Sequence, residues 1–130
     1  MVDSSVLLDV FTEDPQWGDW SHHRLTEAAR SGALVLNAVV LAEISPRFSR
    51  IESLKQALPS MARVDEIPAA AAFLAGHAHA AYRRAGGARE AILPDFLIGA
   101  HAAVTNRPLL TRDPRRVANY IPGARLIAPA

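Results

Sequence analysis

Short apolar segments alternate with longer, more polar ones along the chain. The apolar segments are predicted as strands at 33–37 ("ALVLN"), 62–68 ("ARVDEIP"), 107–113 ("RPLLTRD") and 124–129 ("ARLIAP"). The chain also opens on a very short strand within "MVDSSVLL", which runs into a helix with Asp3 at the junction.

Helices are predicted between these strands, and proline, glycine and asparagine residues mark their boundaries. The predicted helices cover 13–32, 38–49, 50–58, 69–87 and 93–106, with a short helix or turn at 114–123. Asn37 is expected to cap the helix that follows it, and Pro46 to break or kink that helix. Gly86 and Gly87 close the long alanine-rich helix.

Alternation of strands and helices indicates an α/β fold with a mainly parallel sheet. The strands lack a clean alternation of apolar and polar residues, so we expect them to be covered on both faces. With 130 residues and no linker-like segment, the chain is predicted to form one domain, residues 1–130.

Composition narrows the classes of function. The chain has no cysteine, which excludes disulfides and thiolate metal sites. Its apolar runs fall short of the ~18 residues of a membrane span, and no secretory signal is evident, so a cytoplasmic protein is expected. The net charge is only +1, and of fourteen basic residues only Lys55 is a lysine. The arginines suit bidentate phosphate binding, although a coding bias explains them equally well.

Ligands of open parallel sheets bind at the edge where strands give way to helices, and four acids are candidates for that edge. Asp3, Glu43 and Asp113 each come after a predicted strand, and Asp95 lies in the first turn of the helix after the glycine pair. Each has a simpler explanation: Asp3 as a helix cap, Asp95 as an acid at a helix N-terminus, and Asp113 as part of an Asp-Pro turn. Glu43 is harder to explain, because its helix "NAVVLAEI" is apolar nearly all round and is expected to be well buried.

Four acids at one edge of a sheet would repel one another unless cations neutralise them or some stay protonated. Carboxylates without cysteine or histidine ligands suit hard ions, and we therefore expect Mg²⁺ or Mn²⁺. Such ions polarise phosphates and activate water, which is the chemistry of phosphodiester hydrolysis.

The same segments resemble the PIN-domain ribonucleases, and among them the VapC-type toxins of bacterial toxin–antitoxin pairs. The matching pieces are "VDSSVLLDVF", "LNAVVLAEI", "ILPDFLIGAHA" and "LLTRDPRRV", which together span nearly the whole chain. The resemblance implies a three-layer α/β/α sandwich with a central, mainly parallel sheet. It also implies a Mg²⁺- or Mn²⁺-dependent endoribonuclease in which Asp3, Glu43, Asp95 and Asp113 form the acidic catalytic and metal site. It also implies an RNA substrate and a cognate antitoxin, and it leaves the oligomeric state open, a homodimer included.

Hydroxyl residues beside two of the acids are candidates for a supporting role. Ser4 or Ser5 would fix the Asp3 carboxylate or a metal-bound water, or else cap a helix. Thr111 points to the same side of its strand as Asp113, and either orients a carboxylate or is an ordinary β-branched strand residue.

Arginines near the acids are candidates for binding RNA phosphates, with solvated surface arginines as the alternative. They are Arg89, Arg112, Arg115 and Arg116. The five histidines form no recognisable ligand pattern. Trp17 and Trp20 lie three residues apart on one helical face, either as core residues or as anchors for a protein partner.

Other acid-pocket proteins fit less well. A receiver domain needs paired acids at the first strand and a lysine near the last strand, and a haloacid-dehalogenase-type phosphatase needs an aspartate where this chain has Ser5. The remaining alternatives are a PIN-like binding module without catalysis, which would be expected to lack some of the acids, and a PIN nuclease that processes RNA without a toxin role.

Overall fold

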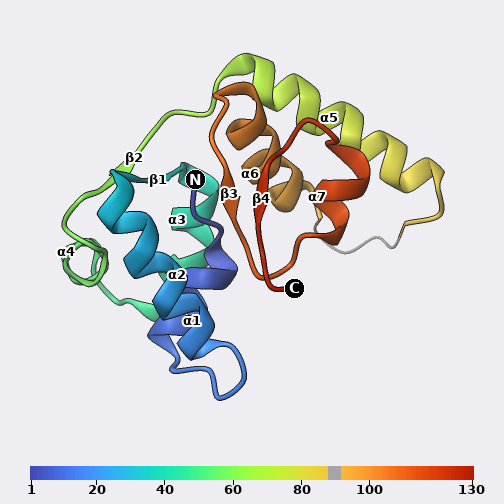
Figure 1. The fold of residues 1–130 in the computed structure, drawn as a ribbon. Coiled ribbons are helices and arrows are strands. Elements are labelled where there is room, and N and C mark those ends of the chain that lie inside the picture. Colours follow the sequence, from blue (N-terminus) through green and yellow to red (C-terminus); the bar gives the residue numbers. More distant parts are fainter. Residues whose placement is uncertain (88–91) are drawn as a thin grey trace.

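The computed structural model describes residues 1–87 and 92–130. Its elements run in the order α1 (Ser4–Phe11), α2 (Gly18–Ser31), β1 (Leu34–Leu36), α3 (Ala38–Ile44), the 3₁₀ turn Ser45–Arg47, α4 (Ile51–Ala57), β2 (Ala62–Val64), α5 (Ala69–Arg84), α6 (Leu93–Val104), β3 (Leu109–Leu110), α7 (Arg115–Tyr120) and β4 (Leu126–Ile127). The mixed α/β class predicted from the sequence is confirmed (Figure 1).

The strands form two parallel pairs, β1 with β2 and β3 with β4. The N-terminal residues lie between the pairs: the Val2 amide donates to Val35, and Val2 forms a parallel bridge with Leu110. Two small sheets thus stand where the sequence predicts one central sheet. The reason is local, because the chain enters α1 at Ser4 and leaves only Val2 to bridge the pairs.

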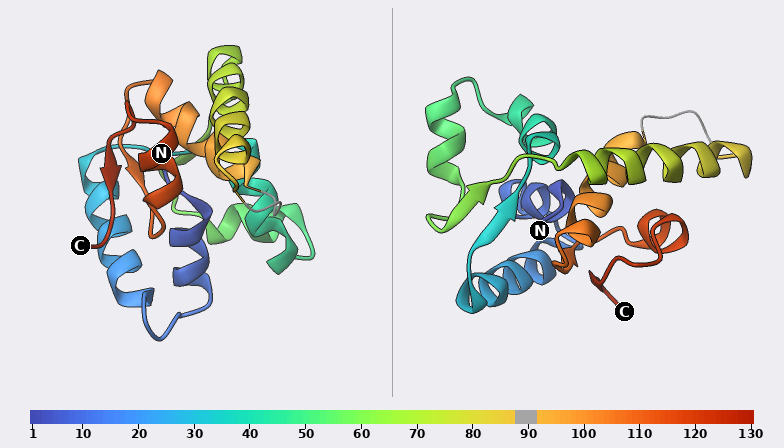
Figure 2. Two further views of the ribbon diagram at one scale, coloured as in Figure 1. Left: turned by 90° about the vertical axis from the view of Figure 1, so that its right-hand side faces the viewer. Right: turned by 90° about the horizontal axis from the view of Figure 1, so that it is seen from above.

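Helices pack on either side of these strands (Figures 1 and 2). On one side α1 contacts α2 and α3, and on the other α5, α6 and α7 contact one another, with α3 also touching α6. The core contains Leu7, Leu36, Ile44, Phe96 and Leu109, each at most 1% exposed. Within the described residues, no helix has both the length and the apolar character needed to cross a membrane.

Most helix boundaries are confirmed, and the exceptions have local causes. Asn37 caps α3 by accepting a hydrogen bond from the Val40 amide, and the helix gives way to a 3₁₀ turn at Pro46. The helix predicted over 13–32 begins only at Gly18, because the Asp14 carboxylate first accepts hydrogen bonds from the Gln16 and Trp17 amides in a turn.

The expectation of strands covered on both faces holds only for the inner strands. β1 and β3 are fully buried and also bond to the segment around Val2, whereas β2 and β4, at the outer edges of the two pairs, are partly exposed. The expectation that the helix of Glu43 is well buried is wrong. Only Val40 and Ile44 of α3 are buried, and Glu43 is on its exposed side.

Candidate active site

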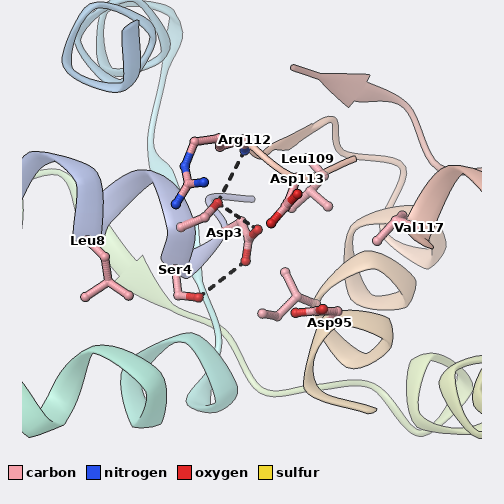
Figure 3. Close-up of a pocket in the computed structure, with 10 residues that line it drawn as sticks. Asp3, Ser4, Leu8, Asp95, Leu109, Arg112, Asp113 and Val117 are labelled. Atoms are coloured by element: carbon pink, nitrogen blue, oxygen red, sulfur yellow. Dashed lines mark hydrogen bonds between the residues drawn. The ribbon is translucent and has the colours of Figure 1, made fainter. Parts of the chain in front are cut away.

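Three of the four candidate acids line one pocket of about 200 Å³ at the junction of α1, α6 and the end of β3. Asp3 comes from the start of α1, Asp95 from the first turn of α6, and Asp113 from the loop after β3 (Figure 3). The apolar part of the lining comes from Leu8, Ile98, Leu109 and Val117. Residues from both ends of the chain therefore converge on this pocket.

Two of the pocket acids, Asp3 and Asp95, are positioned by a buried neighbour in the sequence. Asp3 follows Val2, which is 2% exposed, and Asp95 precedes Phe96, which is fully buried. The Phe96 ring packs edge-on against Tyr82 and Tyr120, with centroid distances of 5.9 and 5.8 Å. Because these apolar side chains fix the backbone, the adjacent carboxylates are held at the edge of the core.

Asp3 occupies the N-cap position of α1, but its side chain makes no capping hydrogen bond. Its Oδ2 atom instead accepts hydrogen bonds from Thr111 Oγ1 at 2.7 Å and from Ser5 Oγ at 3.0 Å. Ser4 Oγ lies 3.5 Å from the other oxygen, Oδ1. The carboxylate is thus fixed mainly through one oxygen, and Oδ1 is left with the weaker contact.

Glu43 does not line this pocket, but it is linked to it through Ser4. Ser4 Oγ donates a 2.8 Å hydrogen bond to Glu43 Oε1. Although Glu43 is on the exposed side of α3, partial desolvation of its carboxylate raises its pKa, and the nearby charge of Asp3 raises it further, while the Ser4 hydrogen bond opposes both. The partner that the sequence left open for this acid is therefore a serine hydroxyl.

Asp95 is the acid most affected by its neighbours. Burial raises the pKa of Asp95 from 3.8 to about 6, and the charges of Asp3, Glu43 and Asp113 act in the same direction. The guanidinium of Arg116 opposes the shift, but its Nη1 lies 3.6 Å from Asp95 Oδ2 and both side chains are largely solvent-accessible, at 52% and 39%. The pocket therefore carries more negative charge than its arginines neutralise.

The candidate arginines differ in their surroundings. Arg112 lines the acid pocket, but its Nε donates to Asp9 Oδ2 at 2.9 Å. Arg115 and Arg116 are exposed and border a second hollow next to Asp113. Arg89 lies outside the described residues.

Asp9 is a residue that the sequence analysis missed. It is 2% exposed and accepts hydrogen bonds from Ser21 Oγ at 2.7 Å and from Arg112. A signal was present, because "SVLLDVF" is an apolar helix interrupted by one acid, and the argument applied to Glu43 applies equally there.

Histidines and tryptophans lie apart from the acids. His101 is buried, with its Nδ1 3.2 Å from the Asn37 amide nitrogen, and burial lowers its pKa. Trp17 and Trp20 are partly buried and pack edge to face at 6.5 Å. Trp20 also packs against the core, which favours the packing interpretation for that ring.

The polar groups of the pocket are those that a hard metal ion prefers. All of the polar groups near Asp3 and Asp95 are carboxylate or hydroxyl oxygens, apart from arginine, and this set suits Mg²⁺ or Mn²⁺. Among residues 1–87 and 92–130, however, no three histidine, cysteine or acidic side chains are close enough together to form a complete ligand group. The residues fit a hard cation in chemistry and charge, with the carboxylates more widely spaced than in a closed coordination shell.

The α/β fold and the pocket lined by three carboxylates place this chain among the α/β proteins that have an acidic pocket. The chain belongs to the PIN domain family, whose profile matches residues 1–120. No curated protein sequence matches the chain.

Solved structures share the fold over almost the whole chain. VapBC2 from Rickettsia felis, bound to a promoter DNA fragment, aligns at a TM-score of 0.72 with 20% identity, covering 98% of this chain and 96% of the other. DNA-bound VapBC from Salmonella typhimurium aligns at a TM-score of 0.69 with 20% identity, covering 98% of this chain and 96% of the other. A toxin–antitoxin complex from Klebsiella pneumoniae aligns at a TM-score of 0.60 with 19% identity, covering 99% of this chain and 96% of the other.

Proposed function

We propose that this protein is a Mg²⁺- or Mn²⁺-dependent endoribonuclease that hydrolyses RNA phosphodiester bonds at the acid pocket. The observation that carries the proposal is that Asp3, Asp95 and Asp113 line one pocket of a PIN domain, although they come from distant parts of the sequence. Burial first, and then the charges of Asp3, Glu43 and Asp113, raise the pKa of Asp95, so a divalent cation that binds there would offset both.

Within this proposal the residues have separate tasks. Asp3 and Asp95 would hold the ion, with Asp113 beside them and Glu43 acting through Ser4. Ser5 and Thr111 hold the Asp3 carboxylate in one orientation, which lowers the cost of ordering it when the ion binds. When bound, the ion lowers the pKa of water and stabilises charge on the phosphate.

The rim of the pocket supplies positive charge for the RNA backbone. Arg115 and Arg116 are exposed beside Asp113, where they would contact phosphates of the RNA backbone. Contacts of this kind hold the strand without reading its sequence, so they do not define which RNA is cut.

We further propose that the protein is the toxin of a toxin–antitoxin pair, acting in the cytoplasm and inhibited by a small antitoxin protein. The support is the fold shared with VapBC and toxin–antitoxin complexes. The antitoxin would place a basic side chain near the acids, excluding metal or RNA. Co-purification with the product of a neighbouring short reading frame tests this partner. No complex at micromolar concentration would contradict the toxin role and leave the nuclease proposal intact.

The test of the nuclease proposal is cleavage of RNA in a metal titration. We expect cleavage with Mg²⁺ or Mn²⁺ and none in excess chelator. Sequencing of the RNA ends after expression of the wild type and the Asp95→Asn variant would show which cuts depend on the pocket. Undiminished cleavage in chelator would contradict the metal mechanism, and no cleavage under any condition would favour a PIN-like binding module.

A further inference from the structure

Asp9 is a buried acid that the proposed reaction does not use. Its side chain is 3% exposed, and its Oδ2 atom accepts hydrogen bonds from Ser21 and Arg112. A buried carboxylate needs such partners, because an unpaired charge in the interior is strongly destabilising. Asp9 and Arg112 therefore constrain each other.

Arg112 is connected to the acid pocket by its place in the chain. It stands between Thr111, which binds Asp3, and Asp113, and its backbone amide donates to Ser5 Oγ at 3.3 Å. Its side chain is 30% exposed and lines the pocket. A flexible cation beside several mutually repelling carboxylates would be expected to bridge them.

The structure shows a different arrangement. None of the ion pairs in the described part of the chain joins Arg112 to Asp3, Asp95 or Asp113. In Figure 3 the guanidinium is turned toward α1, away from Asp95 and Asp113. Pairing with Asp9 is favoured because the buried carboxylate lies in a medium of low dielectric, where attraction is stronger than among partly hydrated acids.

We infer that Asp9 is a positioning residue that keeps the Arg112 guanidinium turned away from the acid pocket, so that Arg112 does not join Arg116 in competing with a divalent cation for the carboxylates. This inference rests on the proposed function. Ser21 supports the arrangement by fixing the Asp9 oxygen that Arg112 binds. Without the Asp9 charge, the chain's own arginine would compete with the metal.

The variant that tests this is Asp9→Asn, which keeps the shape of the side chain and a hydrogen-bond acceptor for Ser21 or Arg112. If the released arginine occupies the pocket about nine-tenths of the time, the apparent affinity for Mn²⁺ falls about tenfold. The double variant Asp9→Asn/Arg112→Gln removes both the buried charge and the competing cation, and should restore Mn²⁺ affinity to within about twofold of wild type.

The measurement is Mn²⁺ binding without RNA, followed by electron paramagnetic resonance, with thermal melting to verify folding. Asp19→Asn is the matched control, because it removes one negative charge from an exposed position in the next helix and should leave Mn²⁺ affinity unchanged. Should Asp9→Asn fail to fold, Ser21→Ala tests the same support with both charges retained and should weaken Mn²⁺ binding in the same direction.

A second measurement in metal-free buffer separates this inference from the proposed function. Contacts between the Arg112 guanidinium protons and the Ile98 methyl groups, which line the same pocket, should be stronger by nuclear magnetic resonance in Asp9→Asn than in wild type. Wild type that binds no Mn²⁺ would contradict the proposed function. Two results would overturn the role of Asp9: Arg112–Ile98 contacts that are no stronger in Asp9→Asn than in wild type, or a double variant that binds Mn²⁺ no better than Asp9→Asn. If the double variant also bound RNA more weakly than Asp9→Asn, Arg112 would be a phosphate ligand.

Discussion

Thr111 donates a 2.7 Å hydrogen bond to Asp3 across 108 positions of the sequence. The same Thr111 hydroxyl accepts a hydrogen bond from the Asp113 amide at 3.0 Å. One buried side chain thus ties the first acid of the pocket to the loop that carries the last, which makes its removal informative.

We predict that Thr111→Val lowers both stability and metal affinity. The substitution keeps the β-branched shape but leaves the Asp113 amide without its acceptor, at a cost of about 1–3 kcal/mol in the free energy of unfolding. Urea unfolding and Mn²⁺ binding are the measurements. The matched control is Thr26→Val, whose exposed hydroxyl bonds only its own helix at His22. Equal effects of the two substitutions would show that the link between Asp3 and Asp113 contributes nothing specific.

Replacement of Gly99 and of Gly76 by alanine should change the stability of the protein in opposite directions. A Cβ atom at Gly99 of α6 would lie 2.8 Å from Val117 Cγ1, so Gly99→Ala forces α7 away and should cost about 1–3 kcal/mol. At Gly76 of α5 no atom lies within 4 Å of the added Cβ, and Gly76→Ala should stabilise the helix by about 0.5–1 kcal/mol. Thermal melting of the two variants checks both signs. Stability of Gly99→Ala equal to wild type would contradict the close packing of α6 on α7.

The raised pKa of Asp95 predicts a pH dependence of stability in metal-free buffer. Since the pKa is about 6 in the folded protein and 3.8 ordinarily, the folded state binds the proton more tightly than the unfolded state. This contribution is fully present below pH 3.8 and is lost as the pH rises through about 6. Its size should be on the order of 1 kcal/mol, because a side chain that is 39% exposed is screened by solvent.

The Asp95→Asn variant isolates this contribution. It removes one charge from the repelling set and keeps the shape, so in chelator it should melt at or above the wild-type temperature at neutral pH, with an advantage that shrinks toward pH 4. Millimolar Mg²⁺ should stabilise wild type by binding to the folded state, and the variant less. A variant that melts well below wild type in chelator would show that Asp95 acts chiefly at the helix N-terminus.

The same pKa predicts how metal binding depends on pH. Protonation of Asp95 below about pH 6 competes with the cation. At limiting Mg²⁺ the cleavage rate should therefore fall as the pH drops through 6, and a higher Mg²⁺ concentration should restore much of it. A rate that is flat from pH 7 to 5 at limiting Mg²⁺ would contradict the involvement of Asp95 in metal binding.

Much of the fold could be predicted because its signals are local. Asn37, Pro46 and Pro94 act on the backbone within one helical turn, and the helices they bound appear where expected. The strands were predicted too long, since apolar residues such as Ile67 sit in a run that pairs only as far as Val64. Pairing depends on partners distant in the sequence, and these a local pattern does not reveal.

The sequence likewise predicts some features of the candidate site and misses others. A parallel sheet brings its strand ends together, which predicts that Asp3 and Asp113 lie close, and both line one pocket with Asp95 from the first turn of α6. The pairing of Arg112 with Asp9 and the exposure of Glu43 were not found. Both depend on how α1 and α3 pack against their neighbours, which follows from three-dimensional contacts between whole helices.

RNA cleavage by wild type and Asp95→Asn, compared at saturating Mg²⁺ and in excess chelator, tests the central claim most directly. The claim is that the carboxylates of this pocket hold the metal that cleaves RNA. We predict that wild type cleaves only with Mg²⁺ and that Asp95→Asn, folded to the same extent, does not cleave. Full cleavage by the variant, or cleavage by wild type in chelator, would contradict it.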